Sequence, residues 1–395
     1  MEYLNAARAP YTAHDRALIG TEHARQARAH FARHPSYRPT PVRTVPGLAG
    51  TEAVHVKDES ERMGLGSFKA LGGAYAVHLL AEHEGGGTPF VCASAGNHGI
   101  SVASGAAEVG VDCVVYLSEG VPEAFAQRLR GLGAEVRRSG EDYEASMAAA
   151  IRAAEQNGWR LVSDSSWNGY TGIPLDVMRG YTVLFDELTD PGALPPGLSE
   201  TAHAVGPATP PGAPAGLEAY SGSLNGSSAA TGGHSAAHGA THGSGGAPTH
   251  VFVQAGVGGL AAAGAAYVRD RWGEQPKIVV VEPEGAPCLL ESARAGEPVR
   301  VQGGRTTLGR LDCLEPSIIA HHLLNHLADL YMTITDDQAA DAARLLAGHG
   351  VHLSECGAAG AAGLLALTPA ARDALGLDDA ARPLVVGTEG PVEPK

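Results

Sequence analysis

Short apolar runs alternate with longer alanine- and leucine-rich stretches from about residue 50 onward, and this alternation limits the folds open to the chain. A parallel strand needs a crossover, usually a helix, so the pattern is typical of α/β domains with mostly parallel sheets. The 395 residues, 44% of them hydrophobic, suffice for two domains. We therefore predict two three-layer α/β domains. Strands are expected at 54–57, 90–93, 111–117, 161–163, 249–254, 277–282 and 383–387, and helices at 70–83, 100–109, 123–132, 145–156, 338–347 and 358–367.

The stretch from 191 to 248 breaks this alternation. Gly, Ala, Ser, Pro and His dominate it, and large apolar residues are almost absent. Such a composition cannot bury enough apolar surface to fold, so we expect a disordered insertion. Its histidines, among them His234, His238 and His242, are spaced for metal binding only if they lie on a helix. The glycine content disfavours that helix, so we expect a solvated linker and no metal site.

Charge and cysteine content narrow the class of protein further. The formal net charge of −15 at pH 7 disfavours nucleic acid and membrane as partners, because either would require a basic patch. No apolar window is long enough to span a bilayer, and the N-terminus has no apolar run behind a basic start. Five widely spaced cysteines without a C-x-x-C pair favour buried thiols over disulfides or a zinc site. We expect a cytoplasmic protein.

Lys69 is the first candidate for chemistry. The chain has four lysines, and Lys69 alone sits at a junction between a loop and a predicted helix, among small residues such as Ala70, Gly72 and Gly73. A lysine in that setting is a candidate Schiff-base residue for pyridoxal phosphate. The dipole of the helix at 70–83 and the apolar surroundings would disfavour its protonated form. The alternative is an ordinary solvated lysine.

A second candidate is the segment from Ser94 to Gly99, between a predicted strand and a predicted helix. Backbone N–H groups at such a junction suit an anion, here a substrate carboxylate. The alternative is a helix cap in which Ser94 or Asn97 satisfies the first helical donors. The candidate substrate-binding residues are Ser94, Ala95, Gly96 and His98.

A third candidate is the glycine-rich turn that joins the strand at 249–254 to an alanine-rich helix. Free N–H groups and the positive end of a helix dipole favour a phosphate at this place. Glycine turns also arise from tight packing alone. The turn becomes the expected phosphate site of the cofactor because the chain also has a candidate Schiff-base lysine. The residues of the turn are Gly256, Val257, Gly258, Gly259 and Leu260.

Taken together, the motifs resemble the fold-type II pyridoxal-phosphate enzymes, and among them the diaminopropionate ammonia-lyase family. The resemblance covers most of the chain outside the insertion. The tryptophan loop at 164–170 and the terminal Thr388-Glu389-Gly390 separate this family from the threonine and serine dehydratases. Further similar segments are 57–60, 64–73, 173–174, 180–182, 254–258, 282–283 and 354–358.

The resemblance implies an arrangement of domains and a reaction. Residues 1–84 and 181–395 would form a large cofactor-binding domain that contains the insertion at 191–248, and residues 85–180 a small α/β domain. The reaction would be β-elimination of 2,3-diaminopropionate to pyruvate and ammonia, with pyridoxal 5'-phosphate as cofactor and no metal. A homodimer acting on a small amino acid is also implied.

The resemblance further assigns roles to residues. Lys69 would hold the cofactor and take the α-proton. Asn97 would contact the ring hydroxyl, residues 256–260 the phosphate and Thr388 the pyridine nitrogen. Asp164 would assist departure of the β-amino group, although the residue alone also reads as a turn-forming aspartate.

The chain departs from the family pattern at several positions. Ala95 stands where the family has an aspartate credited with deprotonating the D-isomer, so we expect selectivity for the L-isomer. Arg310 and Leu314 replace glycines and would reshape the substrate pocket, and Pro391-Val392-Glu393 replaces the acidic residues that usually follow the terminal motif. These departures leave open a threonine or serine dehydratase, another β-eliminating lyase, or an inactive binding protein with this fold. An inactive relative would have no chemical need to keep all four of Lys69, Asn97, Asp164 and Thr388, which argues against the inactive form.

Overall fold

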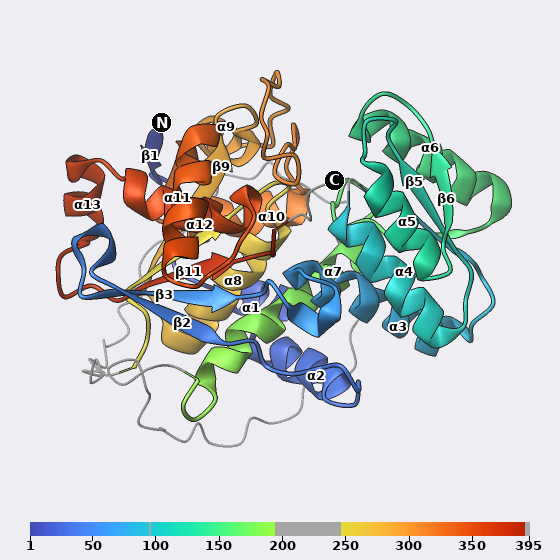
Figure 1. Cartoon of the computed structure of the whole chain (residues 1–395), viewed down its shortest axis with the longest axis horizontal. Coiled ribbons are helices and arrows are strands. Elements are labelled where there is room, and N and C mark those ends of the chain that lie inside the picture. Colours follow the sequence, from blue (N-terminus) through green and yellow to red (C-terminus); the bar gives the residue numbers. More distant parts are fainter. Residues whose placement is uncertain (95, 194–245, 392–395) are drawn as a thin grey trace, which may run out of the picture.

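The computed structural model describes residues 1–94, 96–193 and 246–391, and two sheets organise these residues (Figure 1). A seven-stranded sheet has the order β1-β10-β9-β8-β11-β3-β2, and a four-stranded sheet has the order β6-β5-β4-β7. The larger sheet contains β1 (Glu2–Leu4), β2 (Val42–Pro46), β3 (Ala53–Asp58), β8 (His250–Gln254), β9 (Lys277–Pro283), β10 (Leu330–Ile334) and β11 (Pro383–Gly387). The smaller sheet contains β4 (Phe90–Ala93), β5 (Cys113–Leu117), β6 (Glu135–Arg138) and β7 (Arg160–Leu161).

Both sheets are dominated by parallel pairs. In the larger sheet only β1 and β2 run antiparallel, one at each edge, and all pairs of the smaller sheet are parallel. The helices that connect and cover the strands are α1 (Ala13–Leu18), α2 (Thr21–Phe31), α3 (Gly73–Glu84), α4 (Asn97–Val109), α5 (Glu123–Gly131), α6 (Tyr143–Asn157), α7 (Gly172–Asp186), α8 (Gly259–Trp272), α9 (Cys288–Ala295), α10 (Ile318–Leu327), α11 (Asp336–Gly348), α12 (Glu355–Ala366) and α13 (Pro369–Leu375).

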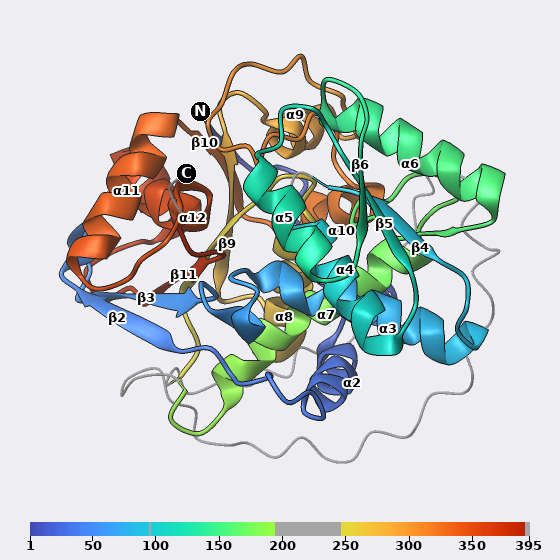
Figure 2. The same ribbon diagram turned by 45° about the vertical axis from the view of Figure 1, so that its right-hand side comes forward.

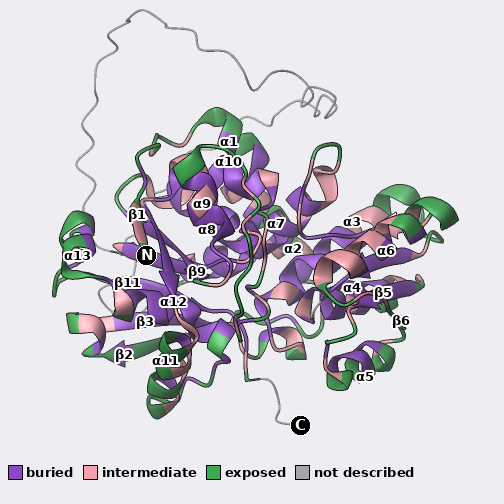
Figure 3. Ribbon diagram, turned by 90° about the horizontal axis from the view of Figure 1, so that it is seen from above, coloured by how far each residue is buried: buried purple, intermediate pink, exposed green. Residues whose placement is uncertain are grey.

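Each sheet is covered by helices on both faces, which confirms the predicted three-layer architecture. Successive strand residues point to opposite faces, and in β9 Ile278 and Val280 join one hydrophobic cluster while Val279 and Val281 join another. Helices α11 and α12 cover one face of the larger sheet, with α8 and α10 behind the other (Figure 2). In the smaller sheet α6 covers one face, and α4 and α5 the other. Figure 3 shows the buried strands between the exposed outer surfaces of the helices.

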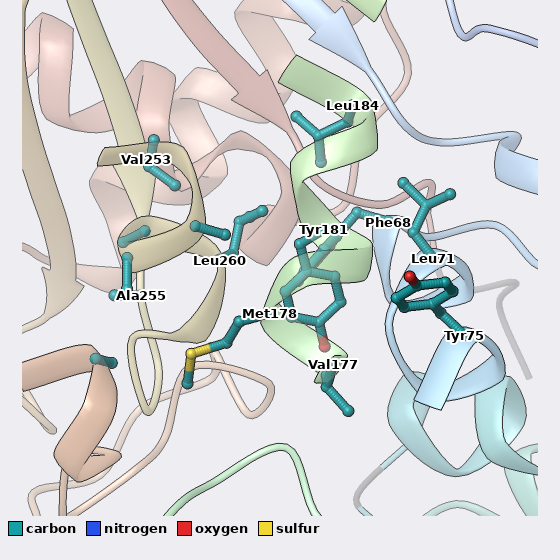
Figure 4. Close-up of a cluster of buried hydrophobic side chains, with 14 of the residues drawn as sticks. Phe68, Leu71, Tyr75, Val177, Met178, Tyr181, Leu184, Val253, Ala255 and Leu260 are labelled. Carbon is teal, nitrogen blue, oxygen red and sulfur yellow. The ribbon is translucent and has the colours of Figure 1, made fainter. Parts of the chain in front are cut away.

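Helix α7 packs between the Lys69 segment and the glycine turn. Its side chains Val177, Met178, Tyr181 and Leu184 lie between Phe68, Leu71 and Tyr75 on one side and Val253, Ala255 and Leu260 on the other (Figure 4). All of these side chains are buried. The two segments predicted to bind the cofactor are therefore held in place by one shared core.

The predicted strands all overlap observed strands, but three predicted helix starts are wrong by three residues, among them that of α12, which begins at Glu355 rather than at residue 358. The segment Phe68–Leu71 forms a 3₁₀ turn in which the Ser67 side chain accepts the N–H of Lys69 at 3.3 Å, and α3 begins only at Gly73. Lys69 therefore does not open the α-helix. Helix α4 begins at Asn97 rather than at residue 100. The prediction also missed β10 and α7 among others, because both depend on burial by distant segments.

Strands within 90–161 form the smaller sheet, while those of the larger sheet come from both ends of the chain. The boundaries at 84/85 and 180/181 remain a prediction. Most of the predicted insertion, residues 194–245, lies outside the described residues. Among the described residues, no helix is long and apolar enough to cross a membrane. All five cysteines are free thiols, and all but Cys313 are buried.

Candidate active site

The predicted site residues gather where parallel strands end. Strands β3, β11 and β8 are neighbours in the larger sheet, and β4 belongs to the smaller one. Ser94 follows β4, Gln254 ends β8 and Thr388 follows β11. Binding sites of α/β proteins form at such carboxyl ends. These segments enclose a cavity of about 130 Å³ whose lining includes Phe68, Lys69, Ser94, Gly96, Asn97, His98, Tyr143, Asp164, Gln254, residues 255–260, residues 309–313, Cys356, Thr388 and Glu389.

Lys69 and Asp164 face each other in this cavity as an ion pair. Their side chains are 23% and 12% exposed, and the Lys69 Nζ lies 5.4 Å from the ring centre of Phe68 and 5.6 Å from that of Tyr181. Burial disfavours the charged form of each side chain, but the attraction between the two opposite charges outweighs the cost of burial. The pKa of Lys69 is raised and the pKa of Asp164 is lowered. The prediction of a lysine with a lowered pKa is therefore wrong, because it overlooked this carboxylate.

The segment that begins at Ser94 shows the capping contacts considered from the sequence, and its role in binding a carboxylate stays a prediction. The Ser94 hydroxyl accepts the N–H of Gly96 at 3.0 Å and the N–H of Gly99 at 2.8 Å, so Ser94 does act as a helix cap. The side-chain amide of Asn97 donates to the carboxylate of Glu389. Ala95 lies outside the described residues.

His98 is buried in the first turn of α4, behind this segment. Its Nε2 lies 3.0 Å from the Val162 carbonyl oxygen, and its Nδ1 lies 4.0 Å from the Asp164 carboxylate. Burial lowers the pKa of His98, which favours the neutral ring. His98 therefore packs beside the Lys69–Asp164 pair without contributing a charge.

Glu389 is a functional-site residue to which the sequence reasoning gave no role of its own. Its carboxylate accepts hydrogen bonds from the Asn97 amide and the Ser354 hydroxyl, and it pairs with the Arg310 guanidinium. Arg310 also donates to the Ser354 hydroxyl at 3.3 Å. The only signal in the sequence was the place of Glu389 beside Thr388. Arg310 does reach the pocket, as its replacement of a family glycine led us to expect.

The glycine turn presents backbone N–H groups at the start of α8. Gly258 has φ +96°, and a Cβ atom there would lie 2.9 Å from Leu289 Cδ1. A Cβ atom on Gly256 would lie 2.8 Å from Cys313 Sγ. Because only glycine fits both positions, the backbone is left open to the cavity at the positive end of the helix. This cradle fits the phosphate of a cofactor.

Thr388 is buried at the opposite wall of the cavity. The Gln254 Nε2 donates to the Thr388 hydroxyl at 3.0 Å and also to the carbonyls of Cys356 and Gly357, at 3.0 and 2.9 Å. The two carbonyls fix the orientation of the amide. The amide shares its two hydrogens among these three acceptors, and its nitrogen cannot accept a hydrogen bond, so Thr388 keeps its own hydroxyl hydrogen for another acceptor, which fits a pyridine nitrogen.

The structure brings the predicted residues together in one cavity, apart from Ala95, which it does not describe. Sequence reasoning also missed Tyr143 and Tyr181. Tyr143 opens α6 and carries no motif, so nothing near it in the sequence points to the site. Tyr181 belongs to a motif of the resemblance, but its position against Lys69 depends on the packing of α7. No group of three or more His, Cys, Asp or Glu side chains in the described ranges is arranged to hold a metal ion.

Comparison with known proteins agrees with this arrangement. The family described as pyridoxal-phosphate dependent enzymes matches residues 34–227 and 214–388. The chain therefore belongs to the pyridoxal-phosphate dependent enzymes, and its two sheets dominated by parallel strands are those of fold type II.

Similarity within that family is more specific. Diaminopropionate ammonia-lyase of Escherichia coli is 29% identical over 96% of this chain and 91% of that protein. The enzyme of the same name from Salmonella typhimurium is 31% identical over 79% of this chain and 72% of that protein. The E. coli crystal structure, in complex with an aminoacrylate-PLP azomethine reaction intermediate, gives a TM-score of 0.78 at 28% identity, covering 99% and 93% of the two chains. The predicted subfamily, the diaminopropionate ammonia-lyases, is confirmed.

Proposed function

We propose that this chain is a pyridoxal-phosphate-dependent lyase that converts 2,3-diaminopropionate to pyruvate and ammonia. The observation that carries the proposal is the pairing of Lys69 with Asp164 in a cavity that also contains a phosphate cradle. A lysine is needed to attach the cofactor, and a buried carboxylate suits a substrate with a second amino group. A hydroxy amino acid such as serine has no β-ammonium group with which Asp164 could form an ion pair.

The overall reaction defines what the side chains must do. The α-proton is removed, and the bond between the β-carbon and nitrogen breaks with its electron pair going to nitrogen, so that the β-ammonium group leaves as neutral ammonia. The 2-aminoacrylate released then consumes one water, giving pyruvate and a second ammonia. Bound pyridoxal phosphate supplies an electron sink that acidifies the α-proton.

Lys69 and Asp164 would have different roles. Lys69 lines the cavity and would accept the α-proton, which requires the neutral amine, so its ammonium must first lose the proton that the Asp164 ion pair favours. Asp164 is ionised at neutral pH because its pKa is lowered. As an anion it would hold the β-ammonium group and orient it for departure. Burial makes this interaction stronger than it would be in water.

The remaining site residues would bind the cofactor and the substrate carboxylate. Residues 256–260 would hold the phosphate, Thr388 the ring nitrogen and Asn97 the ring hydroxyl. Ser94, Gly96 and His98, in the turn before α4 and its first residues, would border the substrate carboxylate. A neutral Thr388 partner does not force a proton onto the ring nitrogen, which limits charge delocalisation and favours elimination over transamination.

Two finer points belong to the proposal. Ala95 has no acidic or basic side chain where the family has an aspartate, so the L-isomer is the expected substrate. The resemblance also supports a homodimer in the cytoplasm, and analytical ultracentrifugation of the holoenzyme tests the homodimer.

The first experiment measures pyruvate and ammonia release by holoenzyme given L- and D-2,3-diaminopropionate, L-serine or L-threonine, with 2-oxobutyrate assayed for threonine. We expect a clear preference for L-diaminopropionate. Lys69→Ala should lose turnover and the visible absorbance of the bound cofactor together. A preference for L-serine or L-threonine would instead favour a dehydratase. Retention of both properties by Lys69→Ala would refute the role of the lysine.

A further inference from the structure

A second cavity of about 330 Å³ adjoins the site. It lies between α6, the tryptophan loop and the segment 313–318. Tyr143, Val257 and Cys313 line both cavities, so they form the boundary between the two. The reaction proposed above does not use this second space.

The second cavity lies on the Asp164 side of the site. Ser165, Ser166 and Trp167 follow Asp164 directly in the chain and line the second cavity. Tyr143, at the boundary, is close enough to Asp164 that burial and the negative charge of Asp164 together raise the pKa of its hydroxyl. The second cavity is therefore the adjoining space into which a group on a nitrogen held by Asp164 would extend.

The walls of the cavity are mainly apolar. Met147 and Ile151 of α6 face Leu314 and Ile318 across it, with Trp167 beside them. The Trp167 ring stacks on Tyr170 with centres 4.4 Å apart, which holds the indole in place. A cavity of about 150 Å³ with apolar walls is large enough to bind benzene. The space beside the site is larger than that.

The rim is charged and exposed. Arg300 lies 3.3 Å from the Glu144 carboxylate and 3.5 Å from the Glu315 carboxylate, and the three side chains are 52%, 40% and 62% exposed. Two carboxylates against one guanidinium give the rim a net negative charge. An anionic group is therefore disfavoured at the rim, whereas an uncharged one is not.

We propose that this cavity is a subsite for an uncharged apolar substituent on the leaving nitrogen of the substrate. The substrate class is then 2,3-diaminopropionates carrying an alkyl or benzyl group on the 3-amino nitrogen. The inference rests on the proposed function and extends it. The α-proton is removed, the bond from the β-carbon to nitrogen breaks with its electron pair going to nitrogen, the substituted ammonium leaves as a neutral amine, and water converts the remaining 2-aminoacrylate to pyruvate and ammonia.

The test compares L-2,3-diaminopropionate with its N3-benzyl derivative and its N3-(4-carboxybenzyl) derivative as substrates of the holoenzyme. Benzylamine and ammonia are of similar basicity, so the two leaving groups differ mainly in size. We expect the benzyl compound to be turned over with a KM no higher than that of the parent. The carboxybenzyl compound should have a KM at least about tenfold higher, because of the charge at the rim.

Variants that fill the cavity provide the matched control. Ala148 of α6 lines the second cavity but not the first, and Ala148→Phe should lower kcat/KM for the benzyl compound by about tenfold or more while changing that for the parent by less than about twofold. Ala340→Phe, at a half-buried position on α11, should change neither value. Ile151→Trp serves the same purpose if Ala148→Phe does not fold.

Binding without turnover separates the two proposals. N-Benzylacetamide has no primary amine, and its binding to wild-type holoenzyme and to Ala148→Phe can be followed by calorimetry. Consumption of the parent but not of the benzyl compound would overturn the subsite and leave the proposed function standing. If the parent itself is not consumed, the proposed function fails. Binding of the fragment that Ala148→Phe abolishes would then still support an apolar subsite, and no binding would overturn it.

Discussion

Asp164 is the residue proposed to decide substrate choice, because its carboxylate pairs with Lys69 and the three residues that follow it line the proposed subsite. We predict that Asp164→Asn lowers kcat/KM for L-2,3-diaminopropionate by about 100-fold or more, the range for loss of a positioned acid–base group. Any activity on L-serine should fall much less, since serine has no β-ammonium. Steady-state kinetics with both substrates checks this.

The control is Asp176→Asn, which removes a carboxylate on α7 that pairs with Arg179 and does not line the cavity. It should leave both substrates unaffected. The pH profile adds a second readout, because the pKa of Lys69 is raised by Asp164 and should fall in Asp164→Asn. An equal loss on the two substrates would mean that Asp164 serves Lys69 rather than the leaving amine.

Arg310 and Glu389 form the second charge pair of the cavity. The Glu389 side chain is 6% exposed and the Arg310 side chain 24%. Removing one partner of a buried pair leaves an uncompensated charge and costs about 3 kcal/mol or more. We predict that Arg310→Ala lowers the free energy of unfolding by about this amount, and that Arg310→Ala with Glu389→Gln recovers much of it. Urea unfolding of the single and double variants measures the coupling, and strictly additive losses would contradict it.

At the scale of elements, a buried charge network joins β3, the turn after it and the end of α7. Lys57 Nζ lies 2.6 Å from Glu187, Arg62 Nη1 lies 2.7 Å from the other Glu187 oxygen, and Arg62 Nε lies 2.7 Å from Glu59. These four side chains are at most 1% exposed. The network fixes the chain just before Lys69 relative to α7, which supports the other side of the site.

This network predicts a pH dependence of stability. Burial opposes ionisation of Glu187, but Arg62 and Lys57 outweigh it and lower its pKa to about 2. The unfolded value is about 4.3. The folded pKa is the lower one, so the stabilisation is full above about pH 4.3 and is lost as the pH falls toward about 2, amounting to on the order of 3 kcal/mol.

We therefore expect the stability gap between wild type and Glu187→Gln to be largest near neutral pH and to narrow below about pH 4.3. Urea midpoints measured at several pH values provide the comparison. Glu22→Gln, at an exposed pair with Arg25 on α2, should show no such narrowing. A gap that stays constant with pH would show that the loss in Glu187→Gln does not come from the carboxylate charge.

Sequence alone predicted the alternating strands, the lysine segment and the glycine turn, because hydrophobic period and glycine chemistry act over short distances. It did not predict the partner of Arg62, since Glu187 lies 125 residues further along the chain. It gave no role to Glu389, which meets Asn97 across 292 positions of sequence. The 3₁₀ turn at Phe68–Leu71 was also missed, because a serine side chain that caps Lys69 replaces the first helical turn. Local sequence patterns therefore identified the segments that form the site, whereas its ion pairs depend on contacts between residues far apart in the chain.

At the scale of the whole molecule, the site is assembled from residues on both sides of the low-complexity segment. Lys69, Asn97 and Asp164 precede that segment, while the glycine turn and Thr388 follow it, and all of them line one cavity. The low-complexity segment contains too few large apolar residues to add to either hydrophobic core. The low-complexity segment can therefore be shortened without removing any of the described side chains that line the cavity.

We predict that deleting residues 206–240 leaves folding and activity unchanged. Each doubling of a flexible loop costs only about 0.6 kcal/mol, so shortening this one should change the free energy of unfolding by about 1 kcal/mol or less. Thermal unfolding and kcat/KM on L-2,3-diaminopropionate are the measurements, with the full chain as reference. Because Ala247, whose carbonyl accepts a hydrogen bond from Arg382, is retained, the start of β8 keeps its anchor. Loss of cofactor binding in the shortened chain would show that the segment contributes to the site, against its composition.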